Sequence, residues 1–139
     1  MPNWIKLVIA IVVGVIVGSL VNGGIISISN QVIPPPPGAD LKTEAGLKAA
    51  MALMEPKHFL MPFLAHALGS LVGAFVATKI APAARHIPAL IIGGLFMLGG
   101  LYMAKILPAP MWFEAADILL AYIPAALLGY LLAKGRANR

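Results

Sequence analysis

Long apolar runs alternate with short polar segments along the chain, and this pattern predicts four membrane-spanning helices. A helix needs about 20 mostly apolar residues to cross a bilayer. Four stretches reach that length, at residues 4–28, 59–80, 87–107 and 112–133. The turns after the second and third stretches are short, which makes consecutive helices antiparallel neighbours. The predicted fold is all-α, an integral membrane four-helix bundle in which residues 1–139 form a single transmembrane domain.

The polar segment 31–57 has a different pattern from the short turns. Pro34–Pro37 cannot donate backbone hydrogen bonds and fix φ near −65°, so they predict a stiff polyproline segment that ends at Gly38. Apolar residues recur every three or four positions across Leu41–Met54, and Thr43 or Asp40 can cap the start of a helix there. We expect a short amphipathic helix that lies at the membrane interface after the first span, because it is too short to cross.

Composition supports a bilayer as the solvent. Sixty per cent of the residues are hydrophobic and 11% are charged, whereas a soluble domain carries about 25% charged residues. The net charge of +5 does not indicate nucleic-acid binding, because the basic residues flank the apolar runs instead of forming one polar face. The chain has no cysteine, which excludes disulfides and thiolate metal sites. The predicted partner is therefore the lipid bilayer and not a nucleic acid.

Basic residues also predict an orientation. Cytoplasmic segments of membrane proteins carry an excess of Lys and Arg. Six of the ten basic residues lie at the two ends and in the second turn: Lys6, Lys79, Arg85, Lys134, Arg136 and Arg139. All five acidic residues lie in the stretches 31–58 and 107–117, which comprise the other two connections and the start of the fourth span: Asp40, Glu44, Glu55, Glu114 and Asp117. We therefore expect both the N and C termini to be cytoplasmic and the two acidic connections to lie outside.

Small residues recur at four-residue spacing within the spans. Lipid provides no hydrophobic force between helices, so close van der Waals contact must hold them together, and small side chains permit it. The helix-packing candidates are Gly14, Gly18, Gly69, Gly73, Gly93 and Gly100. Two interpretations stay open: the faces pack within one chain, or they form the seam of a homo-oligomer.

His66 is the most informative single residue. An ionisable group at membrane depth is costly, so it should face the interior of the bundle. One interpretation is a proton carrier or a ligand contact. The other is a neutral histidine bonded to a backbone carbonyl or a hydroxyl of a neighbouring helix. Ser70 lies one turn further along the same face and is expected to bond to the His66 carbonyl.

Two pairs of titratable residues have i, i+3 spacing, Glu55 with His58 and Glu114 with Asp117. Carboxylate-rich bundles that hold two irons need two Glu-x-x-His motifs, and this chain has one, interrupted by Pro56. We therefore predict no metal and no cofactor. The acids either stabilise helix starts through the macrodipole or line a polar vestibule.

Proline adds a final candidate feature. Pro124 lies near the middle of the fourth span and should kink it, which frees a carbonyl close to Tyr122. The residues predicted to line a ligand cavity are His66, Ser70, Glu114, Asp117 and Tyr122.

Three segments carry a resemblance, residues 34–40, 66–77 and 110–113. They resemble a set of small bacterial membrane proteins that share a Pro-Pro-Pro-x-Gly-x-Asp outer loop and a Gly-rich second helix. The resemblance covers nearly the whole chain. It implies this fold and a bacterial inner membrane, and it implies no activity.

Three functions are consistent with the sequence. The leading hypothesis is a non-enzymatic membrane protein that binds a small ligand, or passes it, through an outward-facing cavity between helices. The alternative is a structural or accessory subunit of a larger membrane complex, whose Gly-rich faces dock partner helices. The third is a membrane enzyme that uses His58, His66 and the outer acids.

Overall fold

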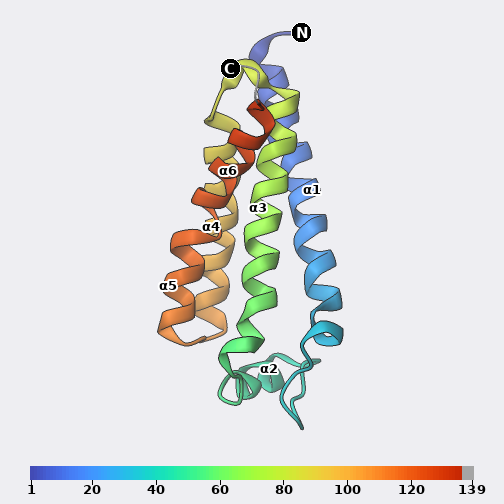
Figure 1. Cartoon of the computed structure of the whole chain (residues 1–139), viewed down its shortest axis with the longest axis vertical. Helices are drawn as coiled ribbons and strands as arrows, with labels where there is room; N and C mark the ends of the chain where they lie inside the picture. Colours follow the sequence, from blue (N-terminus) through green and yellow to red (C-terminus); the bar gives the residue numbers. More distant parts are fainter. Residues whose placement is uncertain (136–139) are drawn as a thin grey trace.

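The computed structural model describes residues 1–135 and shows a bundle of four long apolar helices (Figure 1). Arg136 and Arg139, which entered the predicted orientation, lie outside the described residues. The elements, in chain order, are α1 Asn3–Val32, α2 Glu44–Met51, the 3₁₀ turn η1 Pro56–Phe59, α3 Leu60–Ile80, the 3₁₀ turn η2 Pro82–Ala84, α4 Ile87–Ile106, α5 Met111–Leu120 and α6 Ile123–Lys134. The predicted all-α fold, with four apolar helices and a short helix after the first, is confirmed.

Four of the helical segments are long and apolar enough to cross a membrane: Asn3–Val32, Pro56–Ile80, Ile87–Ile106 and Met111–Lys134. Their outward faces carry large apolar side chains that the fold leaves uncovered, such as Leu20, Leu98 and Leu131. Exposing so much apolar surface to water would cost free energy, whereas contact with lipid tails would not. These features indicate a small multi-pass membrane protein in contact with the lipid bilayer.

The two ends of the bundle differ. The start of α1, the turn η2 and the end of α6 gather at one end, here called the terminal end (Figure 1). The helix α2 and the connection between α4 and α5 lie at the opposite end, here called the α2 end. The stretches 31–58 and 107–117, which carry the acidic residues, therefore share one end of the bundle.

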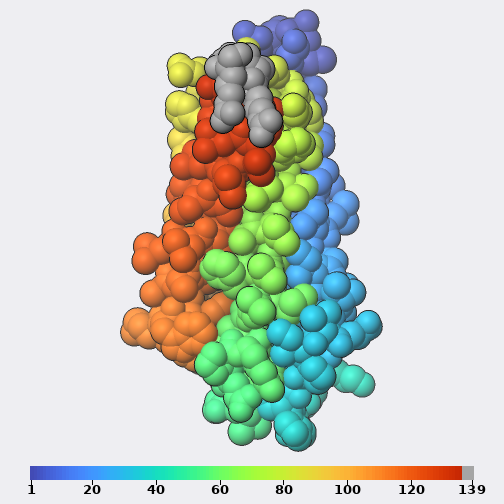
Figure 2. Space-filling model, in the orientation of Figure 1, coloured from blue at the N-terminus to red at the C-terminus, as the bar shows by residue number. Residues whose placement is uncertain are grey.

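The helix α3 occupies the centre, with α1 on one side and α6 on the other (Figure 2). Small residues bring these backbones into contact. A Cβ added to Gly14 would lie 2.7 Å from the Gly73 carbonyl oxygen, and one added to Gly18 would lie 2.6 Å from the Gly69 oxygen. Gly93 approaches Ala126 in the same way, where α4 meets α6. These contacts form within one chain, which favours packing inside the bundle for this part of the glycine pattern.

The amphipathic helix is shorter than predicted, because α2 begins only at Glu44 and ends at Met51. Its start is capped as expected: the Thr43 hydroxyl accepts the Gly46 N–H at 3.0 Å and donates to Asp40 at 3.0 Å. The backbone N–H of Lys42, followed by the Thr43 hydroxyl, holds the pKa of the Asp40 carboxyl below its ordinary value.

The fourth span is broken instead of kinked at Pro124. The helix α5 ends at Leu120 and α6 starts at Ile123, so the break lies at Ala121 and Tyr122. Pro124 then occupies the first turn of α6, where its missing N–H has no helical partner to lose. The break begins four residues after Asp117, and Tyr122 within it belongs to the site described next.

Candidate functional site

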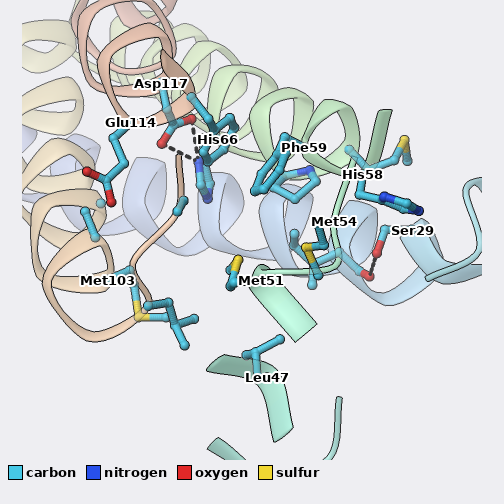
Figure 3. A pocket seen from close by; sticks show the side chains of 18 of the residues that line it. Ser29, Leu47, Met51, Met54, His58, Phe59, His66, Met103, Glu114 and Asp117 are labelled. Atoms are coloured by element: carbon cyan, nitrogen blue, oxygen red, sulfur yellow. Dashed lines mark hydrogen bonds and ion pairs between the residues drawn. The ribbon is translucent and has the colours of Figure 1, made fainter. Parts of the chain in front are cut away.

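A carboxylate, an imidazole and a phenol meet inside the bundle where α5 ends. Asp117 comes from α5, is only 5% exposed, and faces His66 of α3. The His66 Nδ1 atom lies 2.8 and 2.9 Å from the two Asp117 carboxylate oxygens (Figure 3). The hydroxyl of Tyr122, in the helix break, donates to Asp117 Oδ2 at 3.0 Å. We call His66, Asp117 and Tyr122 the polar triad.

The triad fixes the histidine ring. The carboxylate accepts, so the Nδ1 atom of His66 carries the hydrogen that it donates to Asp117. The His66 ring also stacks on the Tyr122 ring, with 5.5 Å between centroids. The rest of the ring, with Nε2, points away from Asp117 in Figure 3.

Two cavities meet at His66. The outer cavity, of about 610 Å³, lies toward the α2 end and is bounded by α1, α2, α3, α4 and α5. The side cavity, of about 250 Å³, lies deeper, among α1, α3, α4 and the helix break. Four residues line both cavities and form their junction: Asn22, His66, Gly100 and Met103. The imidazole of His66 is therefore accessible from two directions.

The outer cavity is mostly apolar. Methionines and aromatic rings make up much of its wall, including Met51, Met54, Phe59 and Phe113 (Figure 3). The rings of Phe59 and Phe113 pack at 4.7 Å between centroids, which steadies the start of α3 against α5. Unbranched, polarizable methionines let such a wall adapt to ligands of different shape.

The residues predicted to line a cavity are placed differently from one another. His66, Glu114 and Asp117 line the outer cavity, and Tyr122 lines the side cavity. Ser70 is completely buried and lines neither cavity. Its hydroxyl has no hydrogen-bond partner, so the predicted bond to the His66 carbonyl is wrong. Ser70 is the neighbour of Gly69 in the tightly packed face of α3, which accounts for its burial.

The pair Glu55 and His58 stabilises the outer loop. The backbone N–H of Glu55 donates to His58 Nδ1 at 2.8 Å, and His58 Nε2 donates to the Pro34 carbonyl at 3.1 Å. Both ring nitrogens are thus engaged in fastening the polyproline segment to the start of η1, although the ring borders the outer cavity. Within residues 1–135, no group of three or more His, Asp or Glu side chains is placed to hold a metal ion.

Asn22 is a site residue that the sequence analysis missed. It lies at the cavity junction, and its Oδ1 atom is buried without a hydrogen-bond partner. A buried unpaired polar atom is costly, and one in a cavity wall is available to a ligand that donates a hydrogen bond. The signal was present: Gly14, Gly18 and Asn22 are four residues apart, so Asn22 is the polar continuation of the packing face of α1.

The glycine candidates also divide between the two parts of the bundle. Gly14, Gly18, Gly69 and Gly73 lie at helix contacts, whereas Gly100 lies under the triad, where a Cβ would meet the Tyr122 hydroxyl. This close approach means that Gly100 makes room for Tyr122.

No protein-family model matches the chain, and comparison with curated proteins and with solved structures finds no match.

Proposed function

We propose that this protein binds a small ligand in the outer cavity, against the polar triad, and does so without catalysing a reaction. The observation that carries the proposal is the buried carboxylate of Asp117 at the inner wall of a cavity. An acid within a membrane span is costly, and such residues mark ligand or proton pathways more often than structural positions. A cavity of about 610 Å³ is of the size that holds small-molecule ligands.

We favour binding over catalysis because the polar triad has no side-chain nucleophile bonded to it. The 2.8 Å contact of His66 with Asp117 satisfies the distance that an acid–base pair needs. However, the chain has no cysteine, the Ser70 hydroxyl reaches neither cavity, and the cavity-lining serines Ser19 and Ser29 form no hydrogen bond with His66. A histidine–aspartate pair that activates no side-chain nucleophile is better suited to orienting and polarising a ligand than to covalent catalysis.

We further place the α2 end, with the mouth of the outer cavity, on the outer side of a bacterial inner membrane, and both termini in the cytoplasm. The positive-inside rule supports this orientation: six of the ten basic residues lie at the two ends and in the second turn of the sequence, against four toward the α2 end, Lys42, Lys48, Lys57 and Lys105. The resemblance of the outer loop to that of small bacterial membrane proteins supports the choice of membrane.

Cysteine labelling tests whether water reaches the cavity. The chain has no cysteine, so a Met61→Cys variant carries a single thiol in the wall of the outer cavity. A membrane-impermeant thiol reagent should label it in intact cells. Leu98→Cys is the matched control, because Leu98 is 62% exposed on α4 and lines neither cavity. Lipid should protect this thiol. Equal labelling of both positions, or of neither, contradicts a water-filled cavity at the outer side.

Thermal unfolding tests the binding itself. A ligand that binds only the folded state raises the melting temperature. We expect at least one solute from a panel of small amines, alcohols and carboxylates to raise the melting temperature of the wild type, and to have less effect on His66→Leu. A panel in which no solute shifts the wild type would contradict ligand binding.

One observation favours an accessory subunit as a second function. Gly23, Gly24, Gly94 and Gly99 have open space around them, unlike the glycines of the packed face. A partner helix could approach α1 or α4 closely there. Mass measurement of the protein purified in mild detergent distinguishes the two: a lone particle of 14.5 kDa contradicts the subunit function, and a larger stoichiometric complex supports it.

A further inference from the structure

The walls of the two cavities carry acidic side chains and no lysine or arginine of the described residues. The two carboxylates, Glu114 and Asp117, line the outer cavity. Asp117 is satisfied within the polar triad. Glu114 is only partly buried, in the first turn of α5, and forms no hydrogen bond or ion pair with the described part of the chain. The outer cavity therefore holds one carboxylate that no protein cation neutralises.

A buried acceptor lies at the junction of the two cavities. The Asn22 Oδ1 atom is a buried acceptor without a donor. The Glu114 carboxylate is a second acceptor in the adjoining wall. The Asn22 acceptor and the Glu114 carboxylate favour a head group that donates hydrogen bonds and carries positive charge. A carboxylate or phosphate head would meet two acids and no cation, which is unfavourable at low dielectric.

The side cavity opens on the flank of the bundle. Its wall includes Ser19 of α1 together with Leu95 and Gly99 of α4, and all three are exposed. They lie well inside the two spans, away from either end of α1 or α4. An opening at that depth faces lipid tails and not water. The junction at His66 can therefore be reached sideways from the bilayer as well as from the α2 end.

From these features we infer that the ligand is a lipophilic amine, which enters from the bilayer between α1 and α4 and places its ammonium group at the junction of the two cavities. This inference rests on the proposed function and names its ligand class. The apolar body stays in the side cavity and the adjoining lipid. It gains little free energy there, since lipid is as apolar as the cavity wall. Selectivity consequently comes from the head group, through Asn22 and Glu114.

Protection of a single thiol tests the inference. Met103 lines both cavities, so Met103→Cys reports on occupancy of the junction in the otherwise cysteine-free chain. The protein in lipid nanodiscs is labelled with an uncharged, water-soluble maleimide in the presence of dodecylamine, dodecanol or dodecyl sulfate at equal mole fractions in the bilayer. Dodecylamine at roughly ten times its dissociation constant should slow labelling about tenfold. Dodecanol should protect less, and dodecyl sulfate should not protect.

Two leucine substitutions on α4 separate the sideways route from the outer one. A Cβ on Gly99 or on Gly94 meets no atom within 4 Å, so neither change should disturb the backbone. Gly99 lines the side cavity and Gly94 lines neither. In the Met103→Cys background, Gly99→Leu should abolish protection by dodecylamine, whereas Gly94→Leu should retain it. Glu114→Gln should weaken protection by the amine and leave that by the alcohol unchanged.

The outcomes are distinct. Equal protection by dodecanol and dodecylamine would overturn the amine class and leave the proposed cavity function in place. Protection that survives Gly99→Leu would overturn the route through the bilayer. If Met103→Cys is not labelled even without a probe, and no solute shifts the melting temperature, the cavity function fails together with the inference.

Discussion

The terminal half of the bundle and the half toward α2 are built from the same helices but packed in different ways. In the terminal half, α1 contacts α3 through Gly14 and Gly73, and the α6 backbone reaches α3 at Gly129. In the other half, α1 carries Gly23 and Gly24 with open space beside them, and cavities separate it from α4. Because lipid supplies no hydrophobic force between helices, the close contacts of the first half must hold the bundle together. The second half is not needed to hold the bundle together and can therefore contain cavities.

The largest loss of stability is expected from a substitution that forces the helices of the packed half apart. A side chain at Gly129 would collide with the Leu71 carbonyl of α3. Gly129→Leu should therefore cost about 3 kcal/mol of unfolding free energy, the upper end of the usual penalty for overpacking. Circular dichroism of thermal unfolding in detergent measures the loss.

Gly24→Leu is the matched control from the hollow half, since a Cβ added to Gly24 meets no atom within 4 Å. It should change stability by no more than about 0.5 kcal/mol, as surface substitutions do. Equal destabilisation by the two variants would show that the halves do not differ in packing as described.

The next effect concerns the buried carboxylate of the hollow half. Asp117→Ala leaves His66 Nδ1 and the Tyr122 hydroxyl without their acceptor. We expect a loss of about 2 kcal/mol, in the range for leaving buried polar groups unsatisfied. Glu114→Ala removes the same charge from the same helix without breaking a hydrogen bond and should have little effect. A similar fall in melting temperature for both would mean that the triad adds no stability.

A smaller effect is expected at the closest point between α4 and the triad. Gly100→Ala places a methyl group against the Tyr122 hydroxyl and should cost about 1 kcal/mol, the contribution of one hydrogen bond. Tyr122→Phe removes that hydroxyl, so in its background Gly100→Ala should have a reduced cost. Additive effects in this double-mutant cycle would contradict the proposed contact.

The smallest effect should appear at the cap of α2. The folded protein lowers the pKa of Asp40 from its ordinary 3.8, so its ionised form favours the cap above that pH. The contribution disappears as the pH falls through the lowered folded value. Hydrogen exchange of the first α2 amides should thus be faster, relative to intrinsic rates, at pH 2.5 than at pH 5. Asp40→Asn should show no such difference; an identical profile in the wild type would exclude the effect.

The hydrophobic pattern was sufficient to predict four helices, because each apolar run is long enough to span and the turns between runs are short and polar. It was not sufficient for the fourth helix. Pro124 is a local signal for a disruption, and the helix is interrupted two to three residues before it, at Ala121 and Tyr122.

The candidate site, too, could be predicted only in part from the sequence. His66 and Asp117 were each predicted to face a cavity, yet their pairing could not be predicted, because it depends on the relative heights of α3 and α5. Ser70 shares a helix face with His66 but lies one turn deeper, where α3 is packed too tightly to border a cavity. Residue spacing along one helix identifies which residues share a face. The depth at which that face borders a cavity depends on the neighbouring helices.

The length of α1 has a consequence for the membrane itself. Its 30 residues span about 45 Å at 1.5 Å per residue, whereas the 20 residues of α4 match a hydrocarbon thickness of about 30 Å. A helix that exceeds the bilayer tilts to fit it, and the tilt varies with bilayer thickness. Because α1 and α4 form the two edges of the lateral opening, acyl-chain length would set the width of that opening. Bilayer thickness would then regulate access to His66 without any contact between the lipid and the site.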